Sequence, residues 1–113
     1  MISEIKKKWV EALRSGKYKQ GFSRLKYNNG EDVRYCCLGV LCEISGRGSW
    51  NENNIYVTPT AAEKLGLPLE VIQWAGLAGD DADPYIGVEH ASVWNDSRGH
   101  SFEQIADLIE EHL

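Results

Sequence analysis

The two ends of the chain carry the hydrophobic period of amphipathic helices. Apolar residues recur at intervals of three and four near the N-terminus (Ile2, Ile5, Trp9, Ala12 and Leu13) and near the C-terminus (Phe102, Ile105, Ala106, Ile109 and Leu113). Charged residues fall on the opposite faces, as in helices that bury one stripe. Gly16 marks the end of the first helix, and Ser101 with Gln104 has the spacing of a capping box that starts the last. The pattern therefore predicts a helix at each end.

Between these helices the chain first predicts a short antiparallel hairpin. Residues 22–27 and 31–36 flank Asn29-Gly30, a dipeptide that readily supplies the positive φ angles of a tight turn. The apolar run Cys36 to Ile44 follows, with Gly46 after it, and periodicity leaves open a third strand or a buried helix. A helix is the preferred interpretation, because one helical face would hold Leu38, Leu41, Cys42 and Ser45.

The remaining segments are short and rich in turn residues. Polar, glycine-rich residues 46–54 predict a loop, residues 55–58 are β-prone, and Thr58-Pro59 introduces a helix over 60–66. A second short helix is expected over 68–76, with Leu69, Ile72 and Trp74 or Ala75 on its core face. Residues 77–87 predict a loop, and residues 90–99 a short helix or turn. Residues 1–113 therefore predict a single small α+β domain, mostly helical, with one β-hairpin or small antiparallel sheet packed by the N- and C-terminal helices.

Charge is distributed unevenly along the 113 residues, whose formal net charge is −5. Residues 1–34 hold nine Lys or Arg against four Asp or Glu, and the remaining 79 residues hold three against thirteen. A basic first third can attract phosphates, but the acidic remainder opposes a long duplex. The asymmetry favours a compact anionic ligand over duplex nucleic acid.

Apolar runs and cysteines indicate the compartment. The run CCLGVLC (36–42) is far shorter than the ~20 residues of a membrane helix, and the segment MISEIKKKWV lacks the apolar stretch of a signal peptide. Three cysteines, of which Cys36 and Cys37 are adjacent, cannot all pair within one chain and suit a reducing environment. We expect a cytoplasmic protein with no membrane segment.

Four blocks of the sequence carry a family resemblance: WVEALRSGKY (9–18), YCCLGVLC (35–42), LPLEVIQWAGL (67–77) and WND-x-x-G-x-SF-x-x-IADLIE (94–110). Together they resemble a widespread family of small uncharacterised proteins of tailed phages and prophage-bearing bacteria. The resemblance implies a phage or prophage origin and action inside the bacterial host, and it brings no reaction, fold or ligand with it. The 46–57 segment is shorter here than in that pattern.

Motifs for catalysis and metal binding are weak. A nucleophile set could be drawn from Cys36, Cys37 or Cys42 with His90 or His100 and Asn95, but these cysteines lie in the most apolar segment, where core packing is the preferred interpretation. Asn95-Asp96 is interpreted as a turn that orients the last helix. Zinc, calcium and glycine-rich phosphate-loop spacings are absent. We therefore assign no catalytic residue, metal or cofactor.

Aromatic and basic residues interleave around the predicted hairpin. The candidate ligand-binding residues are Tyr18, Lys19, Arg24, Lys26, Tyr27, Arg34 and Trp50, with Tyr35 among them in the sequence. Strand alternation predicts Arg24 and Lys26 on one face, with Arg34 on the opposed strand. Rings supply stacking surface and arginines supply phosphate contacts. The alternative interpretation is an ordinary hairpin with a solvated charged face.

These observations support three hypotheses. The first is a non-enzymatic phage accessory protein that binds, and so sequesters, a small phosphorylated or nucleotide-type ligand of the host, as a homo-oligomer that enlarges its pocket. The second is an adaptor or inhibitor that binds a host protein through an aromatic surface around Trp50 and Trp94. The third is a thiol-dependent enzyme that uses Cys36 or Cys37.

Overall fold

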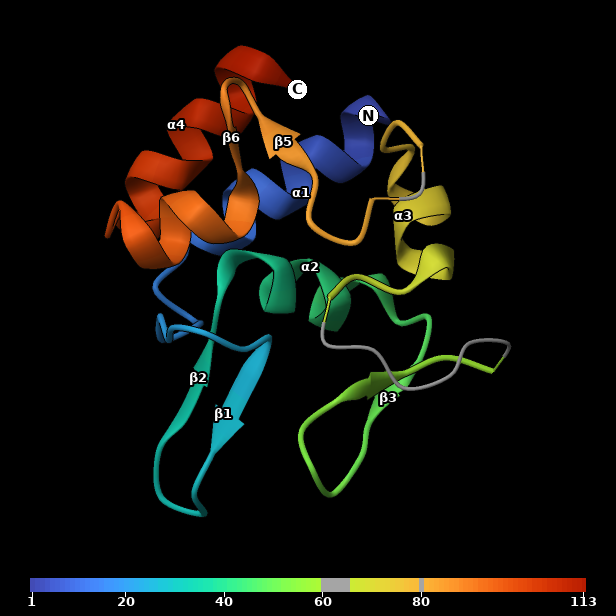
Figure 1. Cartoon of the computed structure of the whole chain (residues 1–113), viewed down its shortest axis with the longest axis vertical. Helices are drawn as coiled ribbons and strands as arrows, with labels where there is room; N and C mark the ends of the chain where they lie inside the picture. The colour runs from blue at the N-terminus through green and yellow to red at the C-terminus, as the bar shows by residue number, and fades with distance from the viewer. Residues whose placement is uncertain (60–65, 80) are drawn as a thin grey trace.

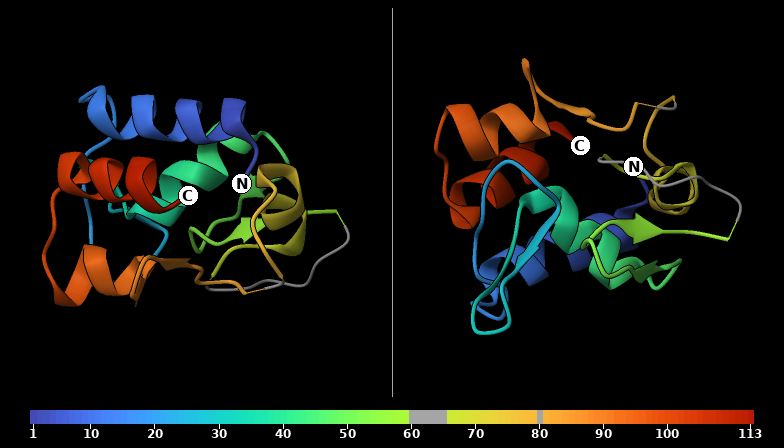
Figure 2. Two further views of the ribbon diagram at one scale, coloured as in Figure 1. Left: turned by 90° about the horizontal axis from the view of Figure 1, so that it is seen from above. Right: turned by 60° about the horizontal axis from the view of Figure 1, so that its bottom comes forward.

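The two terminal helices form the longest packed pair of the fold. The computed structural model describes residues 1–59, 66–79 and 81–113. Helix α1 (Ser3–Arg14) and helix α4 (Phe102–His112) lie side by side and run in opposite directions, which brings the two chain ends close together (Figures 1 and 2). Each buries most of the stripe that its period predicts, although Ile2 is exposed and Val10 is buried in addition. Ser101 with Gln104 forms the capping box of α4. Both predicted terminal helices are confirmed.

The apolar run in the middle of the chain is a helix, α2 (Cys37–Ser45). Its first turn is capped by the Cys36 sulfur, which accepts a hydrogen bond from the Gly39 N–H, and Gly46 ends it with a φ of 63°. The indole Nε1 of Trp9 donates to the Cys37 carbonyl at 2.9 Å, which fastens α1 to α2. The core is built around this helix, because α1 and α3 (Leu69–Ala75) also pack against it.

Three separate two-stranded antiparallel hairpins complete the described chain. They pair β1 (Lys26–Asn28) with β2 (Val33–Tyr35), β3 (Ser49–Trp50) with β4 (Tyr56–Val57), and β5 (Tyr85–Ile86) with β6 (Glu89–His90). The first two project from the same side of α2 (Figure 1). The α+β class is therefore confirmed, although the terminal helices pack mainly on each other, with α1 also against α2 and α4 also against β5 and η1 (Val93–Ser97).

Several local expectations need correction. Strands β3 and β5 lie in segments predicted to be loops, because strands of two residues are fixed by their pairing and leave no period in the sequence. At the first hairpin turn only Gly30 has a positive φ, and the Asn29 side chain accepts hydrogen bonds from two backbone N–H groups that follow it. Leu69 was predicted to lie on the core face of the helix over 68–76. In α3 it is exposed, and Val71 is buried instead.

Residues 90–99 hold a short π-helix, η1 (Val93–Ser97), where a short helix or turn was expected. The helix expected over 60–66 lies outside the described residues, except for Gly66. Among the residues that the structure describes, no helix has both the length and the apolar character to cross a bilayer.

Candidate functional site

A continuous row of aromatic rings joins the first two hairpins. Tyr18 meets Tyr35 with ring centroids 5.4 Å apart, Tyr35 meets Trp50 at 6.0 Å, and Trp50 meets Tyr56 at 4.9 Å. The innermost ring, Tyr56, is buried, whereas the other three are partly exposed. Edge-to-face contacts of this kind stabilise a cluster beyond the area that it buries. The row therefore presents a preformed aromatic surface.

Lys26 lies over the middle of this row. Its Nζ is 5.6 Å from the ring centroid of Tyr35 and 5.2 Å from that of Trp50. Strand register explains the first contact, since Lys26 pairs directly with Tyr35 across the hairpin and side chains of paired residues share one face. We call Tyr18, Lys26, Tyr35 and Trp50 the aromatic–lysine face.

The Trp50 end of this face is held by polar contacts. The Trp50 Nε1 donates to the Glu43 carboxylate on α2 at 2.6 Å. The Tyr56 hydroxyl accepts from the Gly48 N–H at 2.7 Å and lies 3.2 Å from the Ser45 hydroxyl. These contacts fix the β3–β4 hairpin against α2, so the indole is oriented before any ligand arrives.

A groove of about 340 Å³ adjoins the Tyr18 end of the face. Helix α1, the segment after it and helix α2 supply its lining: Lys8, Glu11, Ala12, Ser15, Lys17, Tyr18 and Ile44. The Lys17 ammonium lies 5.6 Å from the Tyr18 ring centroid. An aromatic ring, apolar side chains and two lysines therefore meet at this shallow, open groove.

The fold brings only part of the predicted ligand set together. Tyr18, Lys26 and Trp50 share the aromatic–lysine face. Tyr27 and Arg34 pair with each other on the opposite face of the hairpin, so Arg34 does not join Lys26. The prediction of Arg24 beside Lys26 by alternation fails because β1 begins at Lys26, leaving Arg24 outside the strand.

Two of the predicted cations share one carboxylate. Lys19 Nζ lies 3.1 Å from Asp32 Oδ1, and Arg34 Nε lies 2.7 Å from Asp32 Oδ2. Hydrogen bonds from Arg34 and then from Lys19 lower the pKa of Asp32 below its ordinary value. Both cations are therefore already paired within the hairpin region.

Residues outside the predicted set contribute to the site. Lys17 and Glu43 were missed because neither lies in the interleaved run nor has a motif that links it to Tyr18 or Trp50 in the sequence. Only the packing of α2 against the two hairpins brings Glu43 to the indole.

Over residues 1–113 the sequence matches the family described as a domain of unknown function, DUF8296. The chain belongs to this family. Curated proteins and solved structures give no match. The DUF8296 family assigns no activity, so the function has to be argued from side-chain geometry.

Arg24 of this DUF8296 chain lines a second, smaller cleft of about 100 Å³ beside Cys36. Asp83 and Asp96 line the same cleft, together with Ser23 and Ser92. Both Asp83 oxygens accept hydrogen bonds from Ser92, and Asp96 accepts from the Ser23 N–H at 3.0 Å. The carboxylates therefore organise the cleft, whose volume is too small for a nucleotide.

The thiols offer little nucleophilic character. Cys36, Cys37 and Cys42 are free and buried. Burial is the main cause that raises the pKa of Cys36 to about 11 and that of Cys37 well above its ordinary value. Since the thiolate is the reactive form, this environment favours core packing over the thiol-enzyme hypothesis.

Asn95 is a buried hydrogen-bonding centre and not the turn residue that the sequence indicated. Its Oδ1 accepts from the Gln20 side chain at 3.0 Å and from the Cys37 N–H at 3.3 Å. Its Nδ2 donates to the Gly21 carbonyl at 2.9 Å and to Asp96 at 2.8 Å. Asn95 therefore fastens the segment that leads into β1 to the start of α2.

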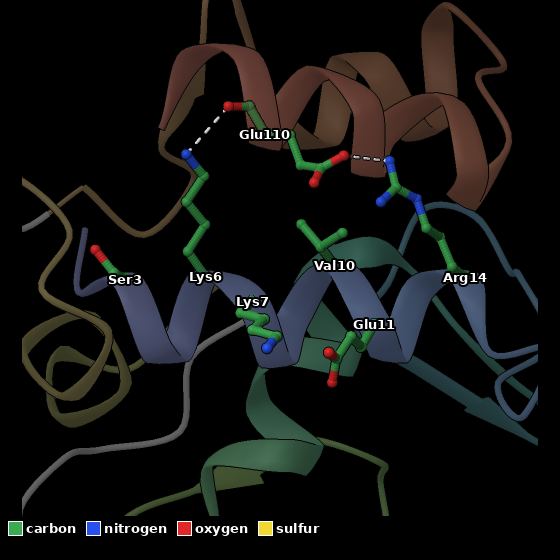
Figure 3. Close-up of a pocket in the computed structure, with 7 residues that line it drawn as sticks. All are labelled: Ser3, Lys6, Lys7, Val10, Glu11, Arg14 and Glu110. Carbon is green, nitrogen blue, oxygen red and sulfur yellow. Dashed lines mark hydrogen bonds and ion pairs between the residues drawn. The ribbon is translucent and has the colours of Figure 1, made fainter.

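A third hollow, of about 310 Å³, lies between α1 and α4, as Figure 3 shows. Lys6 donates to the Glu110 carbonyl at 3.1 Å, and Arg14 contacts the carboxylates of Glu110 and Asp107 at 2.5 Å each. Val10 points into the space between these two bridges. Lys6 and Arg14 are therefore engaged in joining the helices.

Metal binding has no support in the described part of the chain, where no group of three or more His, Cys, Asp or Glu is arranged to hold an ion. Trp94, the second ring of the adaptor hypothesis, is half-buried like Trp50, and its Nε1 donates to the Ile86 carbonyl at 2.8 Å.

Proposed function

We propose that this protein binds a small ligand with a ring and an anionic group, of nucleotide type, at the aromatic–lysine face and its adjoining groove. One observation carries the proposal: the Lys26 ammonium lies over Tyr35 and Trp50 within a row of partly exposed rings. A nucleobase gains about 1–3 kcal/mol from stacking on an aromatic side chain, and a neighbouring ammonium attracts its phosphate.

The biological role that we propose is sequestration without turnover, as a phage accessory protein in the host cytoplasm. Resemblance to phage proteins supports the setting, and a preformed aromatic surface next to cations supports binding. We further propose a symmetric homo-oligomer, because a second copy would deepen an open groove.

Ligand capture tests this proposal. The purified protein is incubated with a mixture of bacterial nucleotides, including cyclic and ADP-ribose-derived ones, and then isolated. Mass spectrometry identifies what co-purifies and what heating releases. Light scattering after size-exclusion chromatography, with and without the recovered nucleotide, tests the oligomer. We expect an intact nucleotide, and a converted product would instead indicate an enzyme.

Charge-matched variants locate the site. Lys26→Ala should weaken binding of the recovered nucleotide at least tenfold, because it removes the cation over the rings. Lys7→Ala removes the same charge from an exposed position on α1 and should leave the affinity unchanged. If both variants lose nucleotide affinity equally, or if neither variant loses it, the ligand binds elsewhere on the protein. If no nucleotide is captured at all, a host-protein partner is favoured instead.

A further inference from the structure

Four of the nine cations in residues 1–34 have side-chain contacts with an acid or a carbonyl elsewhere in the described chain. Arg14 contacts Asp107 and Glu110 on α4, and Lys6 donates to the Glu110 carbonyl. Lys19 and Arg34 share Asp32. Part of the positive charge that the sequence concentrates in residues 1–34 is therefore compensated before a ligand binds.

Arg24 is also removed from the aromatic–lysine face. It lines the small cleft beside Cys36, where Asp83 and Asp96 are the neighbouring acids. Arg24 therefore lines a different hollow from the groove beside Tyr18.

Among the described residues, five charged side chains lie at the aromatic–lysine face and its adjoining groove. Lys8, Lys17 and Lys26 form no ion pair with any residue that the structure describes. Glu11 lines the same groove, and Glu43 holds the Trp50 indole. Three lysines against two glutamates leave this surface with about one net positive charge.

We infer that the ligand carries a ring and a single negative charge, as a phosphodiester or cyclic monophosphate does, and that the site discriminates against polyphosphates. This inference rests on the proposed function and narrows its ligand class. The first negative charge is neutralised by the surplus cation. Each additional negative charge exceeds this one-charge surplus and is repelled by Glu11 or Glu43, so it costs affinity.

A graded ligand series tests the inference. The uncharged nucleosides, 3′,5′-cyclic monophosphates, 5′-monophosphates and 5′-triphosphates of adenosine, guanosine, cytidine and uridine are titrated by calorimetry at pH 7.5 and 0.15 M salt. For any base that binds, the cyclic monophosphate should bind tightest. The triphosphate should bind roughly tenfold more weakly, since each unfavourable charge contributes about a factor of two at this screening.

The possible outcomes separate the two proposals. Triphosphates that bind as tightly as cyclic monophosphates, or more tightly, would overturn the single-charge inference and leave the proposed function intact. Nucleosides that bind as well as cyclic monophosphates would also overturn it, because the anionic group would then contribute nothing. If no compound of the series binds, and the capture experiment also recovers no nucleotide, the proposed function fails as well.

Glu43→Gln provides an internal check, because the amide oxygen can still accept the Trp50 N–H while the charge is removed. In this variant the preference for the cyclic monophosphate over the triphosphate should fall by a factor of about two to three. Glu103→Gln, on the exposed face of α4, should leave the ratio unchanged. A ratio that is the same in Glu43→Gln and in the wild-type protein would overturn the role given to local charge.

Discussion

At the scale of single residues, Asn95 shows how one buried side chain positions distant segments. It is fully buried, and its four hydrogen bonds reach Gln20, Gly21, Cys37 and Asp96. A buried amide with every donor and acceptor satisfied is stabilising, and its removal leaves several partners without a bond. The segment before β1 and the start of α2 depend on this residue for their relative position.

We expect Asn95→Ala to lower the free energy of unfolding by about 2–4 kcal/mol, because the Gly21 carbonyl and the Cys37 N–H lose their partner in the core. Urea denaturation followed by circular dichroism measures the change. Asn53→Ala, at an exposed position, should change it by less than about 0.5 kcal/mol. Comparable values for the two variants would contradict the role of Asn95.

The cysteines permit a second prediction at this scale. With a pKa of about 11, only about one Cys36 thiol in a thousand is ionised at pH 8, and Cys37 is ionised still less. We expect slow labelling of the native protein by iodoacetamide at pH 8 and rapid labelling of all three cysteines in 6 M guanidinium. Rapid, stoichiometric labelling of the native protein would instead revive the thiol-enzyme hypothesis.

At the scale of elements, the first hairpin is seated on α2 through a close backbone approach. The Leu25 carbonyl accepts a hydrogen bond from the Cys36 N–H at 3.2 Å. A Cβ atom at Gly39 would lie only 1.8 Å from the same carbonyl oxygen. Glycine is thus required inside this helix for a packing reason, although it lowers helix propensity.

Gly39→Ala should destabilise the protein by about 3 kcal/mol or more, because backbone atoms cannot move aside as a flexible side chain can. The control is Gly16→Ala, whose Cβ would meet no atom within 4 Å, and whose cost should be limited to the about 1–2 kcal/mol of a left-handed conformation. Thermal denaturation of both variants measures the difference. A Gly39→Ala protein as stable as the wild type would show that α2 and the hairpin are less tightly apposed.

At the scale of the whole molecule, α1, α2 and α4 form one core that carries three small hairpins. Trp9 lies fully buried on α1 and joins the sequence-distant α2 through its indole N–H. The aromatic–lysine face lies outside this core, on hairpins that would be marginal alone. The orientation of the site therefore depends on the integrity of the helical core.

Trp9→Phe should lower the free energy of unfolding by about 2–4 kcal/mol while unfolding remains a single transition, since it leaves a cavity and removes the indole hydrogen bond to the Cys37 carbonyl. Urea titrations followed by Trp fluorescence and by circular dichroism should give coincident curves. Tyr85→Phe, at an exposed ring, should have an effect below about 0.5 kcal/mol. Separate transitions for the two probes would show that the hairpins unfold independently of the core.

Local rules were sufficient to predict the terminal helices, the hairpin at Asn29-Gly30 and the burial of the cysteines. These features follow from periods, caps and turn residues, which act between neighbours in the chain. For the apolar run from Cys36 to Ile44 they left a strand open beside the preferred helix, and packing decided for the helix. The sequence also indicated that aromatic and basic residues would meet near the hairpin.

Tertiary packing decided which of those residues share a face. Lys26 lies with Tyr35 and Trp50 because of strand register and the seating of two hairpins on α2, whereas Arg34 and Lys19 are drawn to Asp32. The basic character of residues 1–34 is a property of the sequence. Its compensation by Asp107 and Glu110 exists only once α4 lies against α1, because electrostatic interactions depend on distance in space and not on distance along the chain.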